Sequence, residues 1–279
     1  MGYLLLFLPL FIVALVATFE IRLPRFAAPF KLSHFSTLIA FGLMGVALSI
    51  ILPLTVQNFL IELVAPFQVL SIPQLPIPNW VGFILCFLLI DFANYWLHRL
   101  SHMIPALWRL HKIHHADKSV SAATNLLHHP AELFFGYLVM LTFFVLLGVP
   151  LLVIIVYGLA NQIHGILVHS NINYPTKLNH WLKYIVFTPD VHRIHHSVDM
   201  VEGNSNFGQI LPFWDIVFGT YQESAVAPIS QFKMGLSHPE QGISFSIISL
   251  LALPVLSGKT SQSEGAVQIN ELSSNKIND

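Results

Sequence analysis

Histidine is the residue type in this sequence with the greatest capacity for chemistry. The chain contains 15 histidines, more than its 13 lysines and arginines or its 14 aspartates and glutamates. Eight of them fall in three short boxes: HxxxH at 98–102, HxxHH at 111–115 and HxxHH at 192–196. Because imidazole nitrogen is a good ligand for iron, copper, zinc and nickel, the boxes indicate metal binding.

The spacing within each box predicts how its histidines are presented. On an α-helix, residues three or four apart lie on one face, so each box can direct all its imidazoles to the same side. The ligands predicted in this way are His98, His102, His111, His114, His115, His192, His195 and His196. A structural zinc site closes with four ligands, so eight nitrogens favour two metal ions, each with about four nitrogens and an open position.

Other metal classes fit these residues less well. The only cysteine, Cys86, excludes a multi-thiolate site and an intrachain disulfide. The HExxH and HxxEH motifs of zinc proteases are absent from the sequence. Bis-histidine haem is disfavoured because Pro105 interrupts any continuous helix between the first two boxes. A membrane metal-binding or transport protein is an alternative, although transporters hold their ligands near the bilayer midplane.

Two aspartates near the boxes are predicted to support the ligands. Asp91 precedes His98 by seven residues and would share its helix face, and Asp199 follows His195 by four residues. A ligating histidine usually donates its other ring N–H to a carboxylate, carbonyl or water, and both aspartates could accept it. The alternative for Asp91 is a pairing with arginine or backbone that only holds the helices together.

The elements that position the boxes are predicted to be apolar helices in a membrane. The chain is 54% hydrophobic and 10% charged, which excludes an ordinary soluble domain. Uncharged runs over 2–19 and 35–58 are long enough to span, and a helix from Trp80 would bring His98 to the membrane surface. Residues 133–168 predict two helices joined by a tight turn. The expected fold is an all-α integral membrane bundle of about four spanning or hairpin helices, with a helical, histidine-rich di-metal cap.

Basic residues give the expected orientation of this bundle. Lysines and arginines follow the first helix, the third helix and the hairpin, whereas 59–79 contains none. Because cytoplasmic loops carry the excess of these residues, we expect the metal site to face the cytoplasm. No basic block or basic–aromatic pattern indicates binding of nucleic acid.

The residues around the boxes resemble a known family. The motifs that carry the resemblance are Asp-Phe-Ala-Asn-Tyr-Trp-Leu at 91–97, Leu-Trp-Arg-Leu at 107–110, His-Pro-Ala-Glu at 129–132, His-Ser-Asn at 169–171, Asn-Phe-Gly at 206–208, Trp-Asp at 214–215 and Phe-Gly-Thr-Tyr at 218–221. With the boxes, they make residues 85–222 similar to the sterol desaturase / fatty acid hydroxylase superfamily of membrane di-iron enzymes. Phe207 is one departure, since the family often has tyrosine there.

The resemblance implies an oxidoreductase that uses O₂ to hydroxylate or desaturate a lipid at an unactivated C–H bond. The lipid class would be sterol-like, fatty-acyl or ether lipid, and the cofactor would be two iron ions. The eight box histidines carry over as ligands, and His169 is added as a ninth. His129 and His164 are implied as ligands or as part of the substrate path. His34, His128, His180 and His238 match nothing in the family pattern and are expected to be structural.

The electron source is expected to be a separate protein. The sequence contains neither a GxGxxG fingerprint nor the His-Pro-Gly-Gly of a fused cytochrome b5 domain. A ferredoxin or a cytochrome-type reductase is therefore implied as partner. A redox-neutral activity on lipids within the same family, such as aldehyde decarbonylation, is the alternative enzyme function.

The predicted organisation has four parts. Residues 1–79 hold the N-terminal membrane helices and an extracytoplasmic loop, and 80–222 form the catalytic domain that resembles the family. Residues 223–256 form a C-terminal segment, in which the apolar run 243–256 is too short to span and is expected to lie at the interface or to pack. Residues 257–279 lack aromatics and predict a disordered tail.

Overall fold

The fold is helical throughout the part of the chain that the structure describes. The computed structural model describes residues 7–26, 31–52, 56–228, 231–237 and 243–256. Within these ranges, β structure is limited to two isolated bridges, Pro24–Ile172 and Ser197–Met234. The predicted tail at 257–279 lies outside the described residues.

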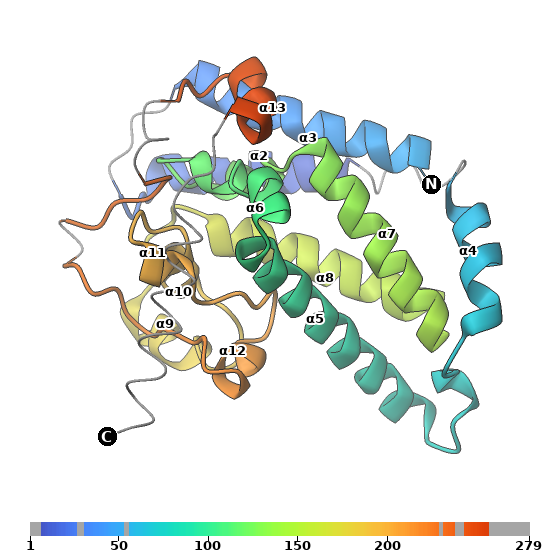
Figure 1. Ribbon diagram of the computed structural model, residues 1–279. Helices are drawn as coiled ribbons and strands as arrows, with labels where there is room; N and C mark the ends of the chain where they lie inside the picture. The colour runs from blue at the N-terminus through green and yellow to red at the C-terminus, as the bar shows by residue number, and fades with distance from the viewer. Residues whose placement is uncertain (1–6, 27–30, 53–55, 229–230, 238–242, 257–279) are drawn as a thin grey trace, which may run out of the picture.

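Four long helices are apolar enough to cross a membrane. They are α3 (Leu32–Leu52), α5 (Asn79–Met103), α7 (Pro130–Leu147) and α8 (Leu151–His169). Their composition and length, together with the all-helical architecture, confirm the predicted multi-pass membrane bundle. Figure 1 shows α7 and α8 meeting at one end, with the start of α5 nearby and its far end at the helical cap.

The helical hairpin of α7 and α8 has the predicted turn. Gly148 ends α7 in the left-handed conformation at φ 57°, which a residue with a Cβ rarely adopts. Pro150 then precedes the first turn of α8, where its missing N–H costs no hydrogen bond. This turn makes both outer ends of the hairpin, at Pro130 and His169, lie on one side of the bundle.

The N-terminal helices differ from the two predicted spans, and α2 (Leu8–Arg22) is not among the four candidate spans of the described residues. Residues 2–6 of the first predicted span lie outside the described residues, and α2 continues three residues past its expected end. The second predicted span, 35–58, is divided: α3 ends at Leu52, and α4 (Asn58–Val64) follows as a short helix packed against α7.

Short elements form the cap. They are α6 (Pro105–His111), η4 (His114–Ala116), η5 (Ala122–Leu126), α9 (Thr176–Leu182), α10 (Pro189–His195), α11 (Met200–Gly203) and α12 (Phe213–Val217). In Figure 1, α9 to α12 lie together beside the cap end of the long helices. The last described helix, α13 (Ile247–Leu256), is short as expected. It contacts α3 and α6, and its buried Leu250 and Leu253 belong to the same hydrophobic core.

Candidate metal centre

The nine histidines predicted as ligands lie in two neighbouring groups. The first group contains His98, His102, His111, His115 and His195, and the second contains His114, His169, His192 and His196. In each group, one ring nitrogen of every histidine lies within 4.8 Å of the others, and all these side chains are buried. The fold therefore brings together the eight box histidines and His169, from α5, α6, η4, α8 and α10 with its C-cap His196.

The second and third boxes are divided between the two groups. α6 ends at His111, and His114 and His115 lie in the 3-10 helix η4 instead of continuing one helix. Adjacent residues point in different directions, so His115 stays with His111 while His114 joins the second group. This corrects the expectation that each box points all its imidazoles at one volume. The two volumes are adjacent, because the rings of His115 and His196 stack at 4.7 Å.

In the first group, two ring nitrogens face each other, and neither carries a hydrogen when both rings are neutral. A neutral imidazole has a single N–H. His98 donates its Nδ1–H to the carbonyl of Phe207 at 2.7 Å, and His111 donates its Nδ1–H to the Glu132 carboxylate at 2.6 Å. The two Nε2 atoms lie 3.1 Å apart with their lone pairs facing. A cation bound by both nitrogens removes the repulsion between these lone pairs.

The second group has the same arrangement. His114 donates from Nδ1 to the carbonyl of Leu127 at 3.3 Å, and His169 donates from Nδ1 to that of Gly165 at 2.6 Å. The Nε2 atom of His169 lies 3.0 Å from that of His114 and 2.9 Å from that of His192. Nitrogens bonded at about 2.1 Å to one metal ion lie about 3.0–3.4 Å apart, so these residues fit a bound metal.

Burial favours the neutral form of five of these imidazoles. It lowers the pKa of His195 to about 3, and it lowers the pKa values of His114, His115, His192 and His196 well below the usual histidine range. The Nε2 atom of His195 is buried and has no hydrogen-bond partner among the described residues. Neutral imidazole with an unpaired nitrogen is the form that binds a metal ion.

A carboxylate and a histidine outside the predicted set connect the two groups. Glu132 accepts the hydrogen bond from His111 and also lies 3.3 Å from Nδ1 of His128. The His128 ring stacks on His114 at 4.6 Å with 9° between the planes. A metal ion between Glu132 and His111 would hold the two ligand atoms about 3 Å apart, so the observed 2.6 Å is a hydrogen bond. The only sequence signal for Glu132 was the motif at 129–132.

Replacing Glu132 by glutamine is expected to weaken metal binding at the first group. Glutamine keeps an acceptor for His111 but removes the negative charge that stabilises this ligand and its cation. Loss of such a partner typically costs about 10- to 100-fold in metal affinity. Titration of the metal-free protein with Zn²⁺ measures this, with Asp199→Asn as the control. Unchanged affinity in Glu132→Gln would contradict the assignment.

The two aspartates predicted as histidine partners make other contacts. Asp91 is fully buried and accepts hydrogen bonds from Tyr157 at 2.9 Å, Trp214 at 3.0 Å and the backbone of Ile210 at 3.3 Å. Asp199 accepts from two backbone N–H groups at the start of α11. This corrects the expected contact of either aspartate with a box histidine. Asp91 joins α5 to α8 and to the segment around α12.

The segment before α12 holds His98 in place. The carbonyl of Phe207 accepts its Nδ1–H, while the backbone N–H groups of Phe207 and Gly208 donate to Asp215 at 2.8 and 2.7 Å. Asp215 is fully buried, and burial raises the pKa of its carboxyl, an effect opposed by these bonds and one from Thr220. The motifs at 206–208 and 214–215 thus position the candidate ligand His98 from a distant part of the sequence.

The two histidines proposed for either the metal or the substrate path lie outside both groups. His129 precedes α7, and its Nδ1 accepts a hydrogen bond from the backbone of Ala131 at 3.1 Å. His164 lies on α8 with its Nε2 at 3.0 Å from the carbonyl of Phe187. The structure therefore gives both residues backbone partners and no shared centre with the nine ligands.

The histidines expected to be structural have varied surroundings. His34 pairs with the buried Asp117 at 3.2 Å and stacks on Phe245 at 4.3 Å. His180 is exposed on α9. His238 lies outside the described residues. His128, in contrast, contacts the second histidine group, because its ring stacks on that of His114.

The N-terminal region also contacts the site. Glu20 on α2 accepts a hydrogen bond from the backbone N–H of Asn171 at 2.7 Å. Arg193, between two predicted ligands, is buried and donates to the carbonyl of Ser170 at 2.6 Å. These two charged groups fix the segment that follows His169, although α2 lies outside the motifs of the resemblance.

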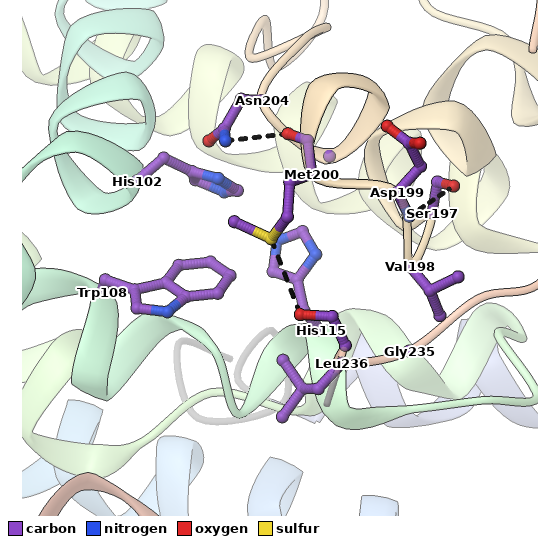
Figure 2. Close-up of a pocket in the computed structure, with 12 residues that line it drawn as sticks. His102, Trp108, His115, Ser197, Val198, Asp199, Met200, Asn204, Gly235 and Leu236 are labelled. Carbon is purple, nitrogen blue, oxygen red and sulfur yellow. Dashed lines mark hydrogen bonds between the residues drawn. The ribbon is translucent and has the colours of Figure 1, made fainter. Parts of the chain in front are cut away.

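A small cavity borders the first group (Figure 2). Its lining includes His102, His115, Trp108 and Asn204, and Figure 2 shows the Met200 side chain pointing into the space between His102 and Trp108. The volume is about 30 Å³, which gives room for about two water-sized molecules. A cavity of this size can hold small molecules such as water beside the first group.

Comparison with known proteins matches this site to a family. The model of the fatty acid hydroxylase family matches residues 83–220, which contain all nine candidate ligands. Residues 83–220 belong to the fatty acid hydroxylase family. The resemblance inferred from the boxes and their flanking motifs is thereby confirmed.

Relatives of this fatty acid hydroxylase segment act on lipids according to their names. An ornithine lipid hydroxylase of Rhizobium tropici is 34% identical over 131 residues, covering 47% of this chain and 39% of the relative. An alkylglycerol monooxygenase of Danio rerio is 26% identical over 227 residues, covering 81% and 48%. A very-long-chain aldehyde decarbonylase of Oryza sativa subsp. indica is 30% identical over 151 residues, covering 49% and 22%. The chain thus spans less than half the length of these relatives. No solved structure matches it.

Proposed function

We propose that this protein is a membrane-bound di-iron oxidoreductase that uses O₂ to hydroxylate or desaturate a lipid. The observation that carries the proposal is the pair of adjacent groups in which buried imidazoles direct ring nitrogens at one another at hydrogen-bond distance or closer than 4.8 Å. The family match and the lipid hydroxylase and monooxygenase relatives support the reaction class. A sterol-like, fatty-acyl or ether lipid is the proposed substrate class.

In this proposal, the nine histidines hold two iron ions, which supply the activation of dioxygen. For hydroxylation, one oxygen atom of O₂ enters the C–H bond and the other leaves as water, which consumes two electrons and two protons. The electrons come from a separate ferredoxin or cytochrome-type reductase, and we place the site on the cytoplasmic side, where the basic loops lie.

The chain's own residues prepare the site for this chemistry. Carbonyl and carboxylate partners fix the tautomers of His98, His111, His114 and His169, so that the metal-facing nitrogens need no rearrangement. Burial of both groups keeps bulk water away from the reacting centre. The task left to the lipid-binding surface is to place one C–H bond beside the metal centre.

Metal analysis of detergent-purified protein tests the cofactor. We expect about two iron ions per chain after anaerobic preparation. Less than one iron, with stoichiometric zinc that iron supply does not displace, would overturn the oxygenase assignment and favour a metal-binding or transport protein.

Lipid analysis tests the reaction. Cells that express the protein are expected to contain a lipid heavier by one oxygen atom or lighter by two hydrogen atoms, compared with cells that express His102→Ala. Incubation under ¹⁸O₂ separates hydroxylation, which incorporates label, from desaturation. A product formed without O₂ would instead indicate a redox-neutral reaction, as the decarbonylase relative's name describes for that protein.

A further inference from the structure

The cap carries an apolar surface outside the four spans. Around α12, the side chains of Phe213, Ile216 and Val217 are each at least half exposed, at 52%, 50% and 55%. The only charged residue of this helix, Asp215, is fully buried. Such a continuous apolar face is unusual on a surface that contacts water.

The position of α12 along α5 places this surface at membrane depth. The Trp214 ring packs on Phe92 at 4.9 Å, and the ring of Phe218 packs on Trp96 at 5.2 Å. Phe92 precedes Arg99, the first lysine or arginine of this span, by seven residues, or about 10 Å at the rise of an α-helix. α12 therefore lies beside the part of α5 that the hydrocarbon surrounds.

The neighbouring helix α9 presents residues typical of a membrane interface. Trp181 is 73% exposed and Ile185, just beyond the helix, is 64% exposed. The Tyr221 hydroxyl donates to the carbonyl of Lys183 at 3.0 Å, which ties α9 to the segment after α12. Figure 1 shows the two helices on the same side of the cap. Tryptophan, tyrosine and lysine are the residues enriched at the headgroup level.

We propose that the bilayer covers this surface, with α12 in the acyl region and α9 at the headgroup level. The surface around α12 continues from the side of α5 that carries Phe92 and Trp96. The one charged side chain of α12, Asp215, is buried, so the exposed face is apolar and suits acyl chains and not headgroups or water. The cap is then partly immersed in the membrane. An acyl chain beside Phe92 lies about 9 Å along α5 from His98, within lateral reach of the first histidine group. This inference rests on the membrane spans and is independent of the metal that the histidines bind.

Spin labels on single cysteines test the immersion. Cys86 is the only cysteine in the chain, so Cys86→Ser gives a background for Ile216→Cys and Trp181→Cys. Val201→Cys is the matched control, because Val201 is 53% exposed on α11 beside Asp199. The full-length protein is placed in phosphatidylcholine vesicles. Relaxation of each label by O₂, which concentrates in acyl chains, is compared with relaxation by a water-soluble nickel chelate.

The expected result is an O₂-to-nickel accessibility ratio several-fold higher at Ile216→Cys than at Val201→Cys, with Trp181→Cys between them. Equal ratios at Ile216→Cys and Val201→Cys would overturn the proposal. An immobilised spin label at Ile216→Cys, with a spectrum broadened by a second label nearby, would overturn the proposal and indicate contact between two copies of the chain. Val217→Cys repeats the measurement if Ile216→Cys does not fold. Metal content measured on the same samples reports separately on the proposed function.

Discussion

His114→Ala is expected to remove one of two metal ions per chain and to lower activity by more than about 100-fold. The second group has only four histidines, and His114 lies 3.0 Å from His169 through their Nε2 atoms. Loss of one of four ligands costs more than the roughly 10- to 100-fold typical of a ligand's hydrogen-bond partner. Metal content per chain and product formation from the identified lipid measure the two effects.

His34→Ala is the matched control for this substitution. It also removes an imidazole, here a partly buried one at the start of α3, but His34 pairs with Asp117 and belongs to neither histidine group. We expect it to keep both metal ions and the activity. If His34→Ala were as damaging as His114→Ala, or if His114→Ala kept two metal ions, the division into ligands and other histidines would be wrong.

Gly208→Ala is expected to displace the segment that holds His98 and to lower the metal content of the first group. A Cβ at this position would lie 2.3 Å from a ring carbon of Phe187 and 2.6 Å from the carbonyl oxygen of Leu211. The backbone cannot shift freely, because the N–H of Gly208 donates to Asp215 at 2.7 Å. Overpacking of this kind costs about 1–3 kcal/mol or more.

The effect of Gly208→Ala is measured by the melting temperature in detergent and by metal content. Gly158→Ala is the control, since a Cβ at Gly158 on α8 meets nothing within 4 Å. Alanine is also the better helix former by about 1 kcal/mol, so this variant is expected to keep its stability and its metal. A Gly208→Ala protein with wild-type melting and metal content would show that the segment does not position His98.

The helices and the candidate ligands follow from local properties of the sequence. Uncharged runs of sufficient length predict spans because the hydrocarbon core sets the length of a helix that crosses it. The turn at 148–150 is encoded by glycine and proline, whose backbone preferences are local. Ligand identity is likewise a property of residue type and spacing, so eight ligands could be proposed from the boxes and His169 from the family resemblance.

The partners of these ligands could not be predicted in the same way. Asp91 and Asp199 were chosen by helical spacing from a histidine, but both bond other groups. Glu132 was not proposed as a partner, because it reaches His111 from a different helix and 21 residues away. A hydrogen bond between helices depends on how the helices pack, and spacing within one helix carries no information about that packing.

The sequence by itself determined the membrane class, the family and the set of histidines that the fold gathers into two groups. Only the tertiary structure decided how the nine imidazoles divide into five and four, which tautomer each partner fixes, and how α12 lies against α5. The physical reason is that composition and periodicity act over a few residues along one helix. The division of the ligands instead depends on where α6 ends, where η4 turns and how α8 and α10 approach them, and these are set by packing between distant segments.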